Sequence, residues 1–133
     1  MTGMGPGQVQ RYKGYSSRYR ACAVQEMRQG NWNRAEEFFW GSLVGVVKAV
    51  ASSRGVQLIG DDDARRYLNT LAQEAGDRWI GDAFDQLSNF AVVSERLRDS
   101  RTSPDRLYHL ADRVSDALDR LWKMLPSDEE DVE

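Results

Sequence analysis

Apolar residues recur at steps of three and four along most of this 133-residue chain, and this helical periodicity constrains its fold more than any other feature. Alternation of apolar and polar residues, which marks a half-buried strand, is not sustained anywhere, and the sequence contains no Asn-Gly or Asp-Gly hairpin turn. Only three prolines interrupt the pattern. We therefore expect an all-α fold.

Helix stop and start signals divide the chain into five expected helices. Gly30 and Gly55 follow the first two, since glycine tolerates the left-handed backbone that ends a helix. Ser103-Pro104-Asp105 places a capping hydroxyl, a proline and an acid at the start of the last one. The five helices are expected at residues 8–29, 32–53, 62–74, 77–98 and 105–124.

The second expected helix is apolar on nearly every face from Phe38 to Ala51, which is typical of a central, buried helix. A chain of this length buries one core. We therefore expect one bundle of five up-and-down antiparallel helices over residues 8–125, with a flexible N-terminus (1–7) and an acidic tail (126–133). The apolar run is too short to span a bilayer and no signal peptide is recognisable, so we expect a cytoplasmic protein without a membrane partner.

Few residues of this chain suit catalysis or metal binding. Cys22 is the only cysteine, and its place on an apolar stripe favours a small core residue. His109 is the only histidine; it could act as a general acid or base, but a lone histidine on a charged helix is more often exposed or structural. The triplet Asp61-Asp62-Asp63 could hold a hard cation, but acids at a helix start more often complement the helix dipole. We expect no metal, no cofactor and no catalytic residue.

The first expected helix combines tyrosines with cations. Residues 1–28 carry five cations against one acid, Glu26, although the whole chain has a net charge of −3. Interleaved tyrosines and cations resemble a surface that stacks the bases and binds the phosphates of a single-stranded nucleic acid. The same spacing fits an ordinary amphipathic helix with tyrosines in the core and cations in solvent. The nucleic-acid or nucleotide interpretation assigns binding to Arg11, Tyr12, Lys13, Arg18 and Arg20.

Two narrow stripes suit the packing of helix against helix. Gly41 and Gly45 lie one turn apart in the second expected helix, and small residues let another backbone approach closely. Val114, Leu118 and Leu121 follow a three-four spacing in the last helix, which is typical of a packing seam. Packing inside the core is one interpretation of the glycine strip, and a homodimer seam is the other. The dimer interpretation assigns the seam to all five residues.

An ordered set of short segments resembles the archaeal PaREP family, which belongs to the HEPN-like group of helical domains. The segments are Met27–Glu36, Trp40-Gly41, Val47–Ala51, Arg54–Leu58 and Leu87–Phe90, and the likeness covers residues 15–125. The resemblance implies a HEPN-like bundle that acts as a homodimer. One departure is Ser88, which stands near a position where the family commonly has a histidine.

The nuclease signature of this group is absent. Active HEPN ribonucleases resemble one another in an arginine and a histidine with four to six residues between them, whereas here Arg101 leaves seven residues before His109 and Arg106 leaves two. The resemblance therefore implies a non-catalytic HEPN-like module that binds RNA or a nucleotide. The alternative is a protein-interaction or structural scaffold, such as the accessory partner of a toxin–antitoxin-like pair. The sequence leaves both alternatives open.

Overall fold

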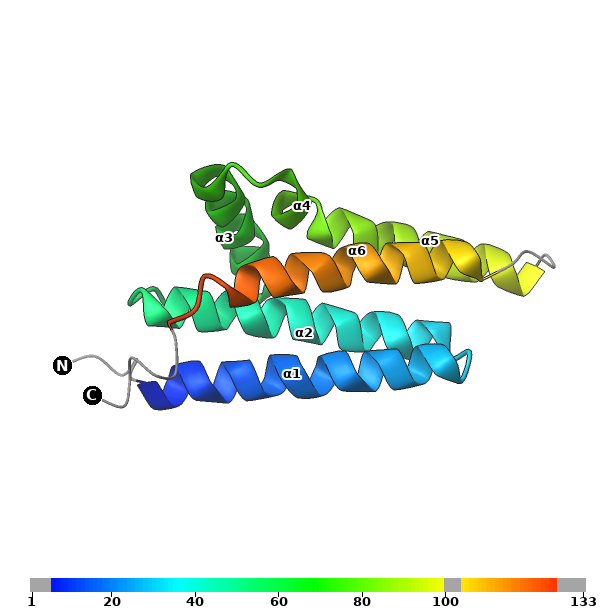
Figure 1. Cartoon of the computed structure of the whole chain (residues 1–133), viewed down its shortest axis with the longest axis horizontal. Helices are drawn as coiled ribbons and strands as arrows, with labels where there is room; N and C mark the ends of the chain where they lie inside the picture. The colour runs from blue at the N-terminus through cyan, green and yellow to red at the C-terminus, as the bar shows by residue number, and fades with distance from the viewer. Residues whose placement is uncertain (1–5, 100–103, 127–133) are drawn as a thin grey trace.

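The computed structural model describes residues 6–99 and 104–126. Within these ranges it contains six helices and no strand: α1 (Pro6–Arg28), α2 (Trp32–Ser53), α3 (Gly60–Ala75), α4 (Arg78–Gly81), α5 (Ala83–Asp99) and α6 (Asp105–Trp122). They pack into one helical bundle (Figure 1), which confirms the all-α prediction. Within residues 6–99 and 104–126, none of the helices combines the length and the hydropathy that spanning a bilayer requires.

Four long helices set the shape of the bundle. α1 and α2 form one antiparallel hairpin, α5 and α6 form a second, and all four follow the long axis of the molecule (Figure 1). α3 is steeply inclined to them and, together with the short α4, joins one hairpin to the other. α2 lies at the centre, because it contacts α1, α3, α5 and α6.

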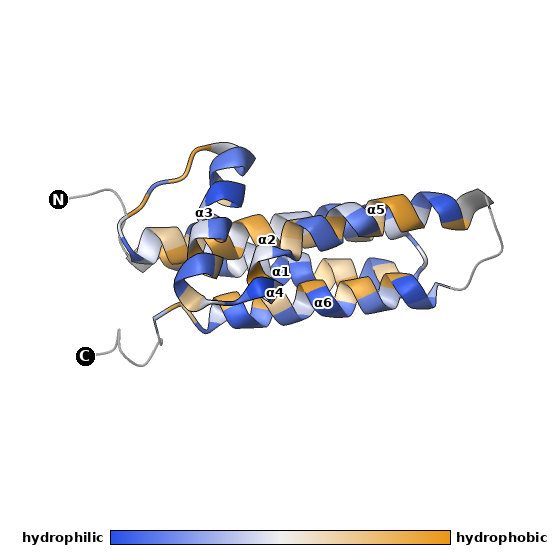
Figure 2. Ribbon diagram, turned by 90° about the horizontal axis from the view of Figure 1, so that it is seen from above, coloured by the Kyte–Doolittle hydropathy of each residue, from blue (hydrophilic) through white to orange (hydrophobic). Residues whose placement is uncertain are grey.

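The apolar run of α2 forms the middle of the core. Leu43 and Val47 have no exposed surface, and Phe39 meets Phe90 of α5 edge to face, with 6.3 Å between the ring centroids. Burying a side chain of this size stabilises the fold by about 1.5–3 kcal/mol. Figure 2 shows hydrophobic residues recurring between hydrophilic ones along α5 and α6, so that each of these helices offers one apolar side to α2.

The helix expected over residues 77–98 is instead two helices, α4 and α5. The Asp77 carboxylate accepts a hydrogen bond from the backbone N–H of Trp79 and so begins α4. α4 ends at Gly81, which sits so close to α3 that a Cβ there would lie 3.3 Å from the Ala72 methyl group. Packing of α4 on α3 accounts for the break, and the described residues therefore form six helices where the sequence predicts five.

The two ends of the chain differ from the sequence prediction in one respect. α1 begins at Pro6, inside the expected flexible N-terminus, whereas residues 1–5 and 127–133, with most of the acidic tail, lie outside the described residues. α1 begins and α6 ends at the same end of the bundle (Figure 1). There the Lys13 ammonium lies 5.5 Å from the centroid of the Trp122 ring.

Candidate nucleic-acid interface

Three aromatic rings line up along the solvent-facing side of the α1–α2 hairpin. Tyr15 and Tyr19, one turn apart on α1, stack with 6.4 Å between ring centroids and 29° between ring planes. Tyr19 stacks in turn on Phe38 of α2, at 6.0 Å and 27°. Both tyrosines are 40% exposed, so their rings are within reach of a ligand. We call Tyr15, Tyr19 and Phe38 the aromatic stack.

Two glycines of α2 make room for this arrangement. A Cβ at Gly41 would lie 3.0 Å from the Tyr19 ring, so a larger residue would push the ring away from α2. A Cβ at Gly45 would lie 3.3 Å from the backbone nitrogen of Ser16. The glycine strip therefore faces α1, and it brings the two helices close enough for a ring from each to stack.

Cations lie at both ends of the aromatic stack. The guanidinium carbon of Arg18 is 5.5 Å from the Tyr15 ring centroid, and that of Arg34 is 6.0 Å from the Phe38 ring centroid. At these distances a cation is attracted to the face of a ring. Both arginines are exposed. Arg34 also lies 3.5 Å from the Glu26 carboxylate, but it is the more exposed partner of that pair and its guanidinium group stays accessible to a phosphate. A cavity of about 180 Å³ opens beside the stack and is lined by Tyr15, Arg18, Tyr19 and Cys22.

Tyr12 extends the same row toward the start of α1. It is half-buried, its hydroxyl accepts a 3.4 Å hydrogen bond from Gln8, and the Lys48 ammonium lies 5.9 Å from its ring centroid. Arg11 is exposed and precedes Tyr15 by four residues, which places it on the same side of the helix. We call the aromatic stack together with Tyr12 the aromatic row. Four cations accompany it: Arg11, Arg18, Arg34 and Lys48.

Lys13 and Arg20 lie on the opposite side of α1, so the five residues expected to bind nucleic acid do not form one surface. Arg20 donates a 2.7 Å hydrogen bond to the carboxylate of Asp119 in α6. The Lys13 ammonium lies over the indole ring that ends α6. At 3.6 residues per turn, these two positions are about half a turn away from Arg11 and Arg18. Only Arg11, Tyr12 and Arg18 of the expected set belong to the row.

The residues expected at a dimer seam pack within the chain. Val114, Leu118 and Leu121 of α6 have no exposed surface, and α1 covers Gly41 and Gly45. The structure thus supports the core-packing interpretation of the glycine strip. Gly45 and the three α6 residues are buried, and the half-buried Gly41 lies against the Tyr19 ring, so in this packing the five residues face helices of their own chain. A homodimer stays a prediction, and it needs another surface.

The thiol and the imidazole take different places. Cys22, expected in the core, is half-exposed beside the aromatic stack. His109 is exposed on α6 and takes no part in the stack. Among residues 6–99 and 104–126, no three side chains of His, Cys, Asp or Glu gather in a group that could hold a metal ion.

The aspartate triplet begins α3. The Asp63 carboxylate accepts hydrogen bonds from the Arg66 guanidinium at 2.7 Å and from the backbone N–H of Ile59 at 2.9 Å. These two hydrogen bonds, with that of Arg66 the stronger influence, lower the pKa of Asp63 below its usual value. Asp61 accepts a 3.1 Å hydrogen bond from the indole N–H of Trp40. Asp61 and Asp63 therefore serve local structure, at the α2–α3 contact and at the start of α3.

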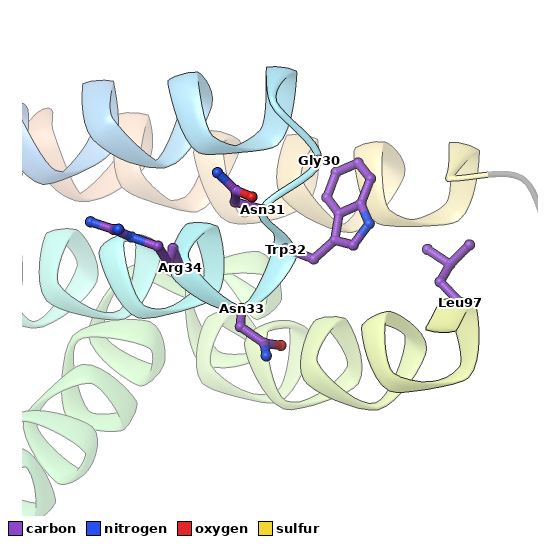
Figure 3. Close-up of a pocket in the computed structure, with 6 residues that line it drawn as sticks. All are labelled: Gly30, Asn31, Trp32, Asn33, Arg34 and Leu97. Carbon is purple, nitrogen blue, oxygen red and sulfur yellow. The ribbon is translucent and has the colours of Figure 1, made fainter. Parts of the chain in front are cut away.

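A larger cavity of about 420 Å³ lies at the turn between α1 and α2 (Figure 3), lined by Gly30, Asn31, Trp32, Asn33, Arg34 and Leu97. Figure 3 shows the side chains of Trp32 and Leu97 facing each other. The two asparagines and Arg34 point in different directions around the first turn of α2. Ligand sites bring a few polar groups together on one point, and here the polar groups diverge. The aromatic stack, with its flanking arginines, is the better candidate.

No family model, curated protein or solved structure matches this chain. The chemistry of its surface is therefore the basis on which a function can be assigned.

The sequence alone does not reveal the residues that α2 adds to the row. The apolar run places Phe38 in a buried helix, and no motif connects Arg34 or Lys48 with the tyrosines. One signal could find them. The turn at Gly30-Asn31 closes an antiparallel hairpin, which brings together residues equally far from the turn. Tyr19 and Gly41 are such a pair, each eleven residues from Gly30, and Phe38 lies one turn before Gly41 on α2, within stacking distance of Tyr19.

Proposed function

We propose that this protein is a non-catalytic module that binds single-stranded RNA along the α1–α2 hairpin. The observation that carries the proposal is the aromatic stack with an arginine at each end. Unpaired bases stack on aromatic side chains, and guanidinium groups pair with the phosphates between them. In a duplex the bases are already stacked inside the helix, so only an unpaired strand can use both features.

The four cations of the row set the electrostatic part of the interaction. Arg11, Arg18, Arg34 and Lys48 follow the same side of the hairpin as the rings. If each neutralises one phosphate, log K should fall with log salt concentration at a slope of about −3 for a single strand. Stacking contributes a part that salt does not screen, so binding should weaken with salt without disappearing.

The proposal includes the HEPN-like relationship and the homodimer that it implies. The ordered resemblance over residues 15–125 supports the relationship, and so does the central position of α2. Light scattering at micromolar concentration tests the dimer. We expect a mass about twice that of the 15.1 kDa chain, and a species of 15.1 kDa alone would contradict this part of the proposal.

Fluorescence anisotropy with a short, dye-labelled oligouridylate tests RNA binding. Tyr15→Ala should weaken binding by about five- to 150-fold, because stacking of a base on an aromatic ring is worth about 1–3 kcal/mol. Tyr15→Phe keeps the ring and should bind like the parent protein. Arg18→Glu should also weaken binding. Arg106→Glu makes the same change of charge at an exposed position of α6 and is the matched control.

Circular dichroism must show the same helix content in all four variants, so that a loss of binding reports the surface and not the fold. Parent-like binding by both Tyr15→Ala and Arg18→Glu would contradict the proposal. A loss with Arg106→Glu equal to that with Arg18→Glu would also contradict it, because binding would then follow the net charge alone.

A further inference from the structure

A second cluster of aromatic and cationic side chains lies on α4, α5 and α6, on helices other than those that carry the aromatic stack. Its centre is Trp79, which is 44% exposed. The guanidinium carbons of Arg113 and Arg120 lie 5.5 and 5.9 Å from the centroid of the Trp79 ring. A cavity of about 220 Å³ opens beside the ring. We call the residues that line it the Trp79 patch: Arg78, Trp79, Asp82, Gln86 and Arg113.

The position of Trp79 is fixed by ion pairs beneath the patch. Arg120 donates hydrogen bonds to both carboxylate oxygens of Asp77, at 2.9 and 3.0 Å, and to Asp116 at 3.0 Å. Asp77 also accepts a 3.0 Å hydrogen bond from the backbone N–H of Trp79. α4 is thereby tied to α6 at the residue that carries the exposed ring. An anchor that is already fixed loses little conformational entropy when a partner binds.

Two cations of the patch keep their charge available. Among the residues that the structure describes, Arg78 and Arg113 take part in no ion pair, whereas Arg120 is held by two carboxylates. Gln86 adds an amide that can donate and accept, and Asp82 adds a carboxylate. The patch therefore offers an exposed ring, two free guanidinium groups and two further polar groups around one small cavity.

We propose that the Trp79 patch is a docking surface for an acidic segment of a partner protein. Carboxylates of the segment pair with Arg78 and Arg113, and an apolar side chain between them packs on the ring of Trp79. Tryptophan and arginine are the residues most enriched among the energetically dominant positions of protein interfaces. A bidentate pair between arginine and carboxylate also fixes the orientation of the partner.

The local charge favours a protein over a nucleic acid at this surface. Arginines and aspartates in and beneath the patch are equal in number: Arg78, Arg113 and Arg120 against Asp77, Asp82 and Asp116. Arg120 is held by Asp77 and Asp116, so the charge that a partner meets is that of Arg78 and Arg113 against Asp82, an excess of one positive charge. This excess suits a short acidic segment and is too small for a nucleic-acid strand, whose affinity grows with the number of phosphate contacts. A carboxylate that lies opposite one guanidinium group instead gains its affinity from the geometry of that single pair. This inference concerns a different surface and a different partner from the proposed binding of RNA along the aromatic row. It does not depend on that proposal.

Nuclear magnetic resonance with a synthetic peptide tests the inference on the full chain. The probe is a peptide with glutamates on both sides of a central leucine, and its control has glutamine at every glutamate. The indole N–H resonance of Trp79, identified by its loss in Trp79→Phe, reports on the patch. We expect this resonance to shift to saturation with the acidic peptide. The affinity should fall about tenfold or more with the glutamine peptide and with Arg113→Gln, while Arg18→Gln should leave it unchanged.

Three results would overturn the inference. The first is a Trp79 resonance that does not move at millimolar acidic peptide. The second is equal affinity for the glutamate and glutamine peptides. The third is an oligouridylate that shifts this resonance at lower concentration than the acidic peptide, which would make the patch a nucleic-acid site. The affinity of Arg113→Gln for oligouridylate, measured by anisotropy, distinguishes the two proposals. It should equal that of the parent protein, because this substitution does not touch the aromatic row.

Discussion

Ser16 and Ser42 donate their hydroxyl groups to each other's backbone carbonyl oxygens, at 2.7 Å in both directions. Both residues are fully buried, and their hydroxyl oxygens are 3.2 Å apart. The pair holds α1 against α2 at Ser42, which lies between Phe38 and Lys48 along α2. It therefore fixes the relative position of the two helices on which the aromatic row depends.

Replacing these serines should destabilise the bundle. Ser16→Ala and Ser42→Ala should each lower the free energy of unfolding by about 1 kcal/mol, the net value of one intramolecular hydrogen bond. Urea unfolding followed by circular dichroism measures this. Ser17→Ala changes an exposed serine next in the chain and should have almost no effect. Equal stability of Ser16→Ala and Ser17→Ala would show that the buried pair contributes nothing.

The two glycines that face α1 should respond differently to alanine. At Gly41 the new methyl group meets the ring of Tyr19, which can swing away, and alanine raises helix propensity by about 0.5–1 kcal/mol. Gly41→Ala should therefore keep or raise stability while weakening RNA binding. At Gly45 the methyl group meets the backbone of Ser16, which moves only with α1. Gly45→Ala should lower the free energy of unfolding by about 1 kcal/mol or more. Thermal melts and anisotropy on both variants test the contrast.

The salt dependence of RNA binding should change with the number of cations in the row. Arg18→Gln removes one phosphate contact, so the slope of log K against log salt concentration should become less negative by about 0.7. Anisotropy titrations over a range of salt concentrations give this slope. Tyr15→Ala should weaken binding at every concentration and leave the slope unchanged, because stacking releases no counterions. Equal slopes for Arg18→Gln and the parent would remove Arg18 from the site.

Arg20 should matter to the fold and not to RNA. It pairs with Asp119 and also donates to the carbonyl of Ser115 at 3.3 Å, so its charge is used within the chain. Arg20→Gln should lower the free energy of unfolding by less than about 1 kcal/mol, as is usual for ion pairs near the surface. Oligouridylate affinity should stay close to that of the parent. A loss as large as that of Arg18→Gln would place Arg20 in the RNA site after all.

The sequence predicts helices well where the information is local. The bounds of α2 follow from the Gly30-Asn31 stop and the long apolar run, and the prediction of 32–53 is the range observed. The break before α5 is not local, since it depends on the packing of Gly81 against α3. The division of the α1 cations between two sides is not local either. Which side of α1 faces solvent depends on where α6 packs, and the periodicity of α1 does not indicate the position of α6.

The pH dependence of stability should reveal what it costs the fold to keep an ionised carboxylate at Glu36. Burial raises the pKa of this half-buried carboxyl group, and the neighbouring charge of Glu37 raises it further. A raised pKa means that the folded protein binds the proton more tightly than the unfolded chain, so the ionised carboxylate costs stability at neutral pH. That cost disappears as the pH falls through the folded pKa. Glu36→Gln should therefore raise the melting temperature at pH 7, and the gain should shrink in acid.

Glu37→Gln, at an exposed neighbour, is the matched control and should give a smaller gain. Thermal melts of the three proteins across acid to neutral pH measure this, and a gain for Glu36→Gln that is the same at every pH would contradict it.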